Sequence, residues 1–150
     1  MKKALFGLLV LTLIFATSCK KSSTSSNAWT FKGTTYSVYT STNTAGAITY
    51  SSINPAGELT CTFSATSPVA GSYSIVSSNS FPTATQVNFT FTNGTVSYGS
   101  TGSGNQMATV TVSSAGKVSV VLPNAPMGGG AIGGGGAQDT SAISGTVTQP

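Results

Sequence analysis

The stretch from Gln86 to Tyr98, QVNFTFTNGTVSY, decides the fold of this 150-residue chain. Val87, Phe89 and Phe91 alternate with polar residues, and a period of two is the pattern of a strand with one buried face. Asn93-Gly94 interrupts the alternation, and this dipeptide favours a type I′ turn because both residues tolerate a positive φ. The stretch therefore predicts an antiparallel hairpin from Val87 to Tyr98.

Register decides which face of this hairpin is buried. A slip of one residue would move Phe89 and Phe91 into water and bury Asn88 and Thr90 instead. Burial of each large apolar side chain is worth about 1.5 to 3 kcal/mol, whereas an unpaired buried amide costs about 1 to 3 kcal/mol. We therefore expect Phe89 and Phe91 in the core, and Asn88 and Thr90 in solvent.

The same alternation continues in both directions along the chain. Further apolar faces are formed by Leu59, Cys61, Phe63 and Ala65, by Ala108, Val110 and Val112, and by Val118, Val120 and Leu122. Turn residues interrupt the alternation at 54–57, 67–68, 81–82 and 114–116. This pattern predicts one all-β domain over residues 29–150, an antiparallel sandwich or barrel of about nine or ten strands. The phase of Cys61 predicts a buried, inert thiol.

The segment from Pro126 to Ala137, PMGGGAIGGGGA, breaks the pattern. It is too rich in glycine to be predicted as a strand, and its composition is that of a flexible linker. It also lacks the GK[ST] sequence and the strand-loop-helix context of a phosphate-binding loop. We expect a mobile loop at 126–137, followed by a last strand from Ala142 to Thr148.

Residues 1–18 have the pattern of a signal peptide. Lys2 and Lys3 precede an apolar run from Ala4 to Ala16, as in the charged and hydrophobic regions of a secretory signal. The run is shorter than the about 20 residues that a transmembrane helix needs. The sequence Ala16-Thr17-Ser18-Cys19 resembles the lipobox of bacterial lipoproteins. That resemblance implies cleavage before Cys19 and acylation of Cys19, with palmitate-type chains anchoring the protein in a membrane.

Residues 19–28 are predicted to be the acylated cysteine and a flexible polar tether. The CKKSS sequence at 19–23, WTFKGTTY at 29–36 and ISGTV at 143–147 resemble the small β-rich lipoproteins of Bacteroidetes. The resemblance implies an outer-membrane location. Lys20 and Lys21 stand where surface-exported relatives carry acidic residues, which favours the periplasmic side, with the cell surface as the alternative.

Few residues of this chain could perform chemistry. It contains no histidine, which excludes a Ser-His-Asp triad, a Cys-His pair and an imidazole metal site. We interpret Glu58 and Asp139 as solvated surface charges and not as a catalytic pair. A Ser-Lys dyad built on Lys32 or Lys117 stays open, although serine is too abundant to favour it. The lysines form no basic patch for nucleic acid. We expect no cofactor, no metal and no enzymatic activity.

A structural or interaction module of the cell envelope is therefore the expected function, and a glycan-binding module is the alternative. Among the aromatic residues, Tyr39 is the ring that we expect to be exposed, and it is the candidate glycan contact. Asp139-Thr140-Ser141 resembles the O-glycosylation motif of Bacteroidetes, which makes Thr140 a candidate modification site.

Overall fold

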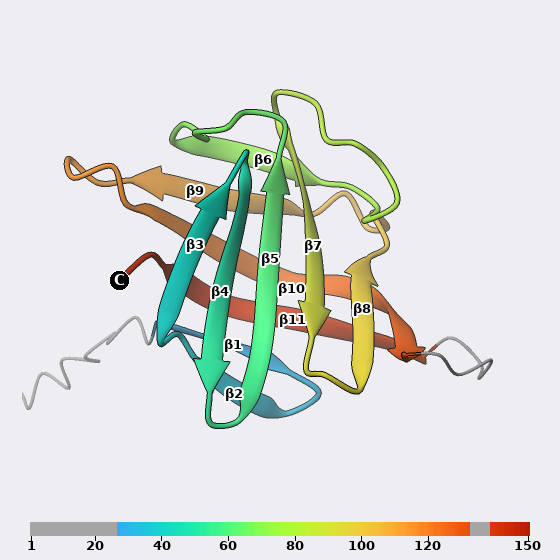
Figure 1. Ribbon diagram of the computed structural model, residues 1–150. Helices are drawn as coiled ribbons and strands as arrows, with labels where there is room; N and C mark the ends of the chain where they lie inside the picture. Colours follow the sequence, from blue (N-terminus) through green and yellow to red (C-terminus); the bar gives the residue numbers. More distant parts are fainter. Residues whose placement is uncertain (1–26, 133–138) are drawn as a thin grey trace, which may run out of the picture.

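Eleven strands and no helix make up the part of the chain that this computed structural model describes, residues 27–132 and 139–150 (Figure 1). The strands are β1 (Ala28–Phe31), β2 (Thr34–Ser37), β3 (Thr40–Thr44), β4 (Ala47–Ile53), β5 (Ala56–Phe63), β6 (Gly71–Ile75), β7 (Gln86–Thr92), β8 (Val96–Ser100), β9 (Met107–Val112), β10 (Val118–Ala131) and β11 (Asp139–Thr148). The all-β prediction is confirmed. The predicted signal peptide, Cys19 and the tether up to residue 26 lie outside the described residues.

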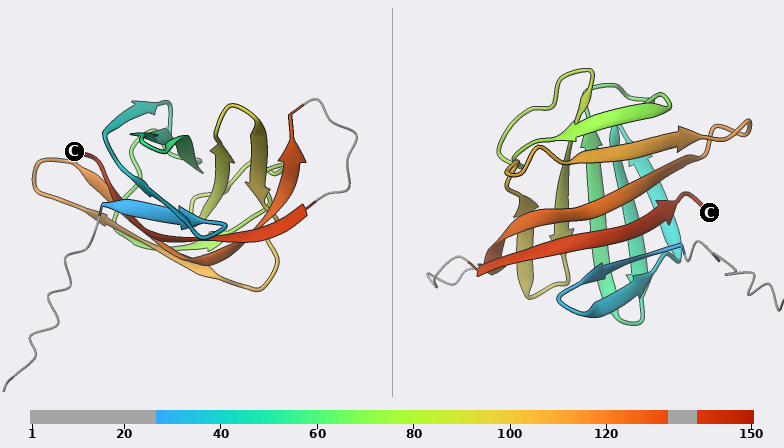
Figure 2. Two further views of the ribbon diagram at one scale, coloured as in Figure 1. Left: turned by 90° about the horizontal axis from the view of Figure 1, so that it is seen from below. Right: turned by 180° about the vertical axis from the view of Figure 1, so that it is seen from behind.

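The strands form two layers whose directions cross steeply (Figures 1 and 2). In Figure 1, β3, β4, β5, β7 and β8 run upright in front, while β6, β9, β10, β11, β1 and β2 run across behind them. Hydrogen bonds connect the strands in the order β2-β1-β11-β10-β9-β6-β7-β5-β4-β3. Because β8 pairs with both β7 and β10, it closes a ring of five strands: β6, β7, β8, β10 and β9. The fold is thus a small barrel with extra strands, and only the β6–β7 pair is parallel.

The core lies between the two layers. Its largest fully buried side chains include those of Trp29, Tyr50, Phe89, Phe91, Ile48, Leu59, Met127 and Ile143. The predicted hairpin forms, with Phe91 opposite Tyr98, and its apolar face is buried as expected.

The prediction that Asn88 lies in solvent is wrong. The loop between β6 and β7 crosses the outer face of β7 there, and the Asn88 side chain donates a hydrogen bond to the Ser80 carbonyl at 2.9 Å.

The turn of this hairpin differs from the predicted type I′ turn. Only Gly94 has a positive φ, at 85°, so Asn93 does not adopt the left-handed conformation that a type I′ turn requires. Asn93 instead accepts hydrogen bonds at Oδ1 from the backbone N–H and hydroxyl of Thr95 and from the N–H of Val96, at 3.1 to 3.3 Å. The side chain of Asn93 thereby closes the turn.

The prediction of a mobile loop from Pro126 is wrong for the first half of that segment. β10 continues to Ala131, and from Met127 onward it pairs with β8 on one edge and with β11 on the other. A Cβ atom on Gly129 would lie 2.1 Å from the Ser97 carbonyl oxygen, which is far inside van der Waals contact. Glycine is therefore required here for close approach of two backbones and not for flexibility. Residues 133–137 of the predicted loop lie outside the described part.

Candidate functional site

A small cluster of polar groups joins the turn after β1 to the start of β11. Lys32 Nζ donates a hydrogen bond to the Tyr98 hydroxyl at 2.6 Å and forms an ion pair with Asp139. The hydrogen bond to Asp139, and then the one to Tyr98, raise the pKa of Lys32. The same two partners lower the pKa of the Asp139 carboxyl. Asp139 is thus an exposed surface charge, as expected, and in addition it is paired with Lys32; both side chains are about half exposed.

This cluster also bears on the Ser-Lys dyad. A lysine that serves as a general base must lose its proton near neutral pH, which requires a lowered pKa. The contacts of Lys32 raise its pKa, so the ammonium group stays charged and acts as a hydrogen-bond donor. Lys32 is thus suited to holding the turn after β1 against β11, and not to activating a hydroxyl.

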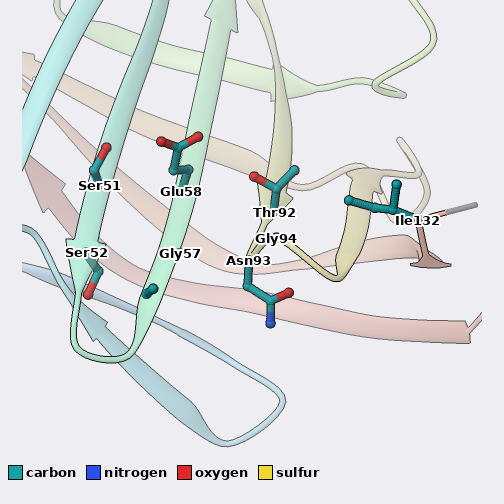
Figure 3. Close-up of a pocket in the computed structure, with 9 residues that line it drawn as sticks. Ser51, Ser52, Gly57, Glu58, Thr92, Asn93, Gly94 and Ile132 are labelled. Carbon is teal, nitrogen blue, oxygen red and sulfur yellow. The ribbon is translucent and has the colours of Figure 1, made fainter.

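A hollow of about 490 Å³ lies beside the β4–β5 and β7–β8 turns (Figure 3). Its lining residues are Ser51, Ser52, Ala56, Gly57, Glu58, Thr92, Asn93, Gly94 and Ile132. Figure 3 shows Ser51, Glu58 and Thr92 side by side across β4, β5 and β7, as their strand register requires. Glu58 is the one charged residue among the described residues of this lining. The hollow offers polar contacts, but no second carboxylate or amine with which Glu58 could share a proton.

A smaller hollow, of about 210 Å³, lies on the outer face of β5 and β7 under the β6–β7 loop. It is lined by Thr62, Ser78, Asn79, Ser80, Phe81, Pro82, Asn88 and Thr90. Phe81 stands at its rim with 99% of its surface exposed. The hollow therefore combines one open aromatic face with hydroxyl and amide groups and no charge.

The structure places the candidate residues of the sequence apart from one another. Tyr39 lies between β2 and β3 and is 66% exposed, so the predicted exposure of its ring is confirmed. It lines neither of the two hollows described above. Thr140 is exposed on β11 next to the ion-paired Asp139. Their roles as a glycan contact and as a glycosylation site stay predictions, and Cys19 lies outside the described residues.

Phe81 is the residue that sequence reasoning missed. The Phe81-Pro82 pair interrupts the alternation, and this pattern predicts only a turn. A large aromatic residue within a stretch of Ser, Asn, Thr and Pro was the available signal, because a turn has no packing use for such a side chain.

Cys61 yields a direct test of the buried face of β5. The thiol is completely buried, and this burial raises its pKa. Because the thiolate is the reactive form, we expect Cys61 to resist a maleimide reagent in the native protein and to react fully in denaturant. Mass spectrometry of the peptide that contains Cys61 measures the labelled fraction. Rapid labelling under native conditions would contradict the assigned faces of β5.

Comparisons with protein-family models, with curated protein sequences and with solved structures found no match to this chain. Among residues 27–132 and 139–150 there is no helix that could cross a membrane. Within the same residues, no group of three His, Cys, Asp or Glu side chains is placed to hold a metal ion.

Proposed function

We propose that the chain is a lipid-anchored lipoprotein of the bacterial outer membrane whose β-domain is a non-catalytic structural or interaction module. The charged start, short apolar run and cysteine of residues 1–19 support the anchor. The assignment of the β-domain as a structural or interaction module depends on the nature of its exposed groups. They are mainly hydroxyls, amides and isolated apolar side chains, presented on strands and anchored loops.

The placement of the reactive side chains supports a non-catalytic domain. The Cys61 thiol is buried, and the raised pKa keeps it protonated. Lys32 and Asp139 neutralise each other in an ion pair. Glu58 lines its hollow without a charged partner among the described residues. Acid-base or nucleophilic catalysis needs at least one activated group beside another, and these four residues provide no such arrangement.

The periplasmic side of the outer membrane is the location that we favour. Lys20 and Lys21 directly follow the lipidated position, where a sorting signal for surface export in Bacteroidetes carries acidic residues. A cell-surface location remains the alternative in this proposal. In both locations the acyl chains would hold the domain at a membrane, because two or three buried chains give stable anchoring where one does not.

Replacement of Cys19 tests the anchor. We expect the wild-type chain, expressed in a Gram-negative host, to fractionate with membranes and to carry an acyl mass on its amino-terminal peptide. Cys19→Ala removes the acylated sulfur and should move the protein to the soluble fraction or leave its signal peptide uncut. Cys61→Ala is the matched control, since Cys61 is buried and should not affect anchoring. Equal solubility of wild type and Cys19→Ala, without an acyl mass, would reject the proposal.

A glycan-binding module is the second candidate function, and two exposed rings favour it. Tyr39 and Phe81 are exposed aromatic residues on two separate connections, between β2 and β3 and between β6 and β7. An exposed aromatic ring can stack on the C–H face of a sugar while neighbouring hydroxyls and amides bond to the sugar hydroxyls. Retention of the full chain on immobilised neutral polysaccharide would support this function, and the absence of retention would reject it.

A further inference from the structure

We infer that Phe81 and the hollow beside it form a binding subsite for one ring of a neutral carbohydrate. This inference depends on the second candidate function, glycan binding, and gives it a location and a ligand class. The location differs from Tyr39, the residue that the sequence alone favoured.

The first support is the exposure of Phe81 on an anchored loop. The ring is 99% exposed, so it contributes almost nothing to the core. Hydrogen bonds hold the chain on both sides of it. Before Phe81, Ser78 N–H bonds to the Ser100 carbonyl at 2.8 Å, and the Ser80 carbonyl accepts from Asn88. After Phe81, Thr83 N–H donates to Gln86 Oε1 at 3.0 Å, and Gln86 N–H donates to the Thr83 carbonyl. The backbone that carries the ring is thus held in place, so that little backbone freedom is lost on binding.

The second support is the chemistry of the wall beside the ring. Thr62 and Thr90 project from β5 and β7 toward the hollow, and Asn79 lines it from the loop. None of the hydrogen bonds among the described residues uses the hydroxyl of Thr62 or of Thr90, or the side-chain amide of Asn79. These donors and acceptors are therefore free for a ligand that carries several hydroxyl groups, and a sugar ring is such a ligand.

The third support is the size and charge of the hollow. Its volume of about 210 Å³ is below the about 300 to 1,000 Å³ of pockets that enclose a drug-sized molecule, and it suits a single ring of a longer chain. No lysine, aspartate or glutamate lines it. A phosphate or uronate group would find no cation there, while an apolar peptide would leave the hydroxyls of the wall unpaired. A neutral sugar matches both the aromatic rim and the polar wall.

Affinity measurements on the full chain test this subsite. The protein is extracted in a detergent without a sugar headgroup, and its binding to soluble mannan, xylan and β-glucan is measured by affinity electrophoresis and calorimetry. Polygalacturonate serves as the anionic comparison. We expect binding to at least one neutral polysaccharide, with little change between about 0.1 M and about 1 M salt because no charge is involved.

Substitutions then locate the binding. Phe81→Ala should weaken binding about ten-fold by removing the stacking face. Phe81→Tyr should retain binding because the ring is kept. Thr62→Val removes the hydroxyl with little change in side-chain volume and should weaken binding several-fold. Val69→Ala is the matched control, because Val69 is also an exposed apolar residue in a loop but lies outside the hollow. Fluorescence of the buried Trp29 reports that each variant is folded.

The outcomes separate the subsite from the wider function. If Phe81→Ala binds like wild type while Tyr39→Ala does not, the subsite is wrong and glycan binding stands. If the wild type binds no neutral polysaccharide, the subsite and the glycan-binding function are both overturned, and if it binds only polygalacturonate, the neutral ligand and the subsite are overturned. None of these results affects the lipid anchor, which the Cys19 variants test separately.

Discussion

Phe89→Ala is expected to destabilise the domain by about 3 to 5 kcal/mol, the cost of truncating a fully buried aromatic side chain. Phe89 is completely buried in the middle of β7, opposite Cys61 on β5. Its removal would leave a cavity between the two layers, and the crossing strands could close this cavity only in part. Denaturant unfolding followed by Trp29 fluorescence measures the change, since Trp29 belongs to the same core.

Thr90→Ala is the matched control, one position further along the same strand. Thr90 faces the outer hollow and is only partly buried, so its truncation should change the free energy of unfolding by less than about 0.5 kcal/mol. Equal effects of the two alanine substitutions would show that the assigned faces of β7 are wrong. The prediction thus tests the alternation on which the fold assignment was built.

Gly129→Ala should destabilise the domain by about 3 kcal/mol, at the upper end of the usual cost of overpacking. An added Cβ would lie 2.1 Å from the Ser97 carbonyl oxygen and 2.7 Å from the Tyr98 Cα, both in the backbone of β8. Backbone atoms cannot rotate away as a flexible side chain can. The substitution would push β8 from β10 and so open the ring of five strands at this pair.

Gly130→Ala separates this steric effect from the general effect of losing a glycine. An added Cβ at Gly130 meets nothing within 4 Å, and Gly130 is not among the glycines with a positive φ. Its replacement should therefore be neutral or stabilise by about 0.5 kcal/mol, because alanine restricts the unfolded chain. A comparison of the two melting temperatures measures the difference. Equal tolerance of both substitutions would support a flexible segment at this point.

The local pattern of the sequence was sufficient for much of the fold. Alternation identified β5, β7, β9 and the first part of β10, because the period of two depends only on neighbouring residues. The 114–116 turn was likewise predictable, and Gly116 has the positive φ, 76°, that such a turn requires. The burial of Cys61 followed from the phase of its strand and was confirmed.

Features that depend on distant segments were not predictable from the same pattern. Asn88 is buried because a loop from before β7 folds back over it, and Gly129 lies in a strand because β10 pairs closely with β8 at this point. The exposure of Phe81 depends on the path of the same loop. In each case the deciding contact joins residues that are brought together only by the tertiary fold, so composition and periodicity carried no information about it.

The positions of the β6–β7 loop and of the chain entry have a consequence for binding strength. Asn27 is fixed to the last strand by two hydrogen bonds with the Thr148 backbone, at 2.7 and 2.9 Å. The loop and this entry point lie at opposite sides of the domain (Figures 1 and 2). On the proposed lipid anchor at Cys19, copies held in one plane would present their β6–β7 loops away from their points of attachment. If the proposed Phe81 subsite binds one ring of a long repetitive polymer, the polymer could engage several copies at once, and this multivalency would strengthen weak single-ring contacts.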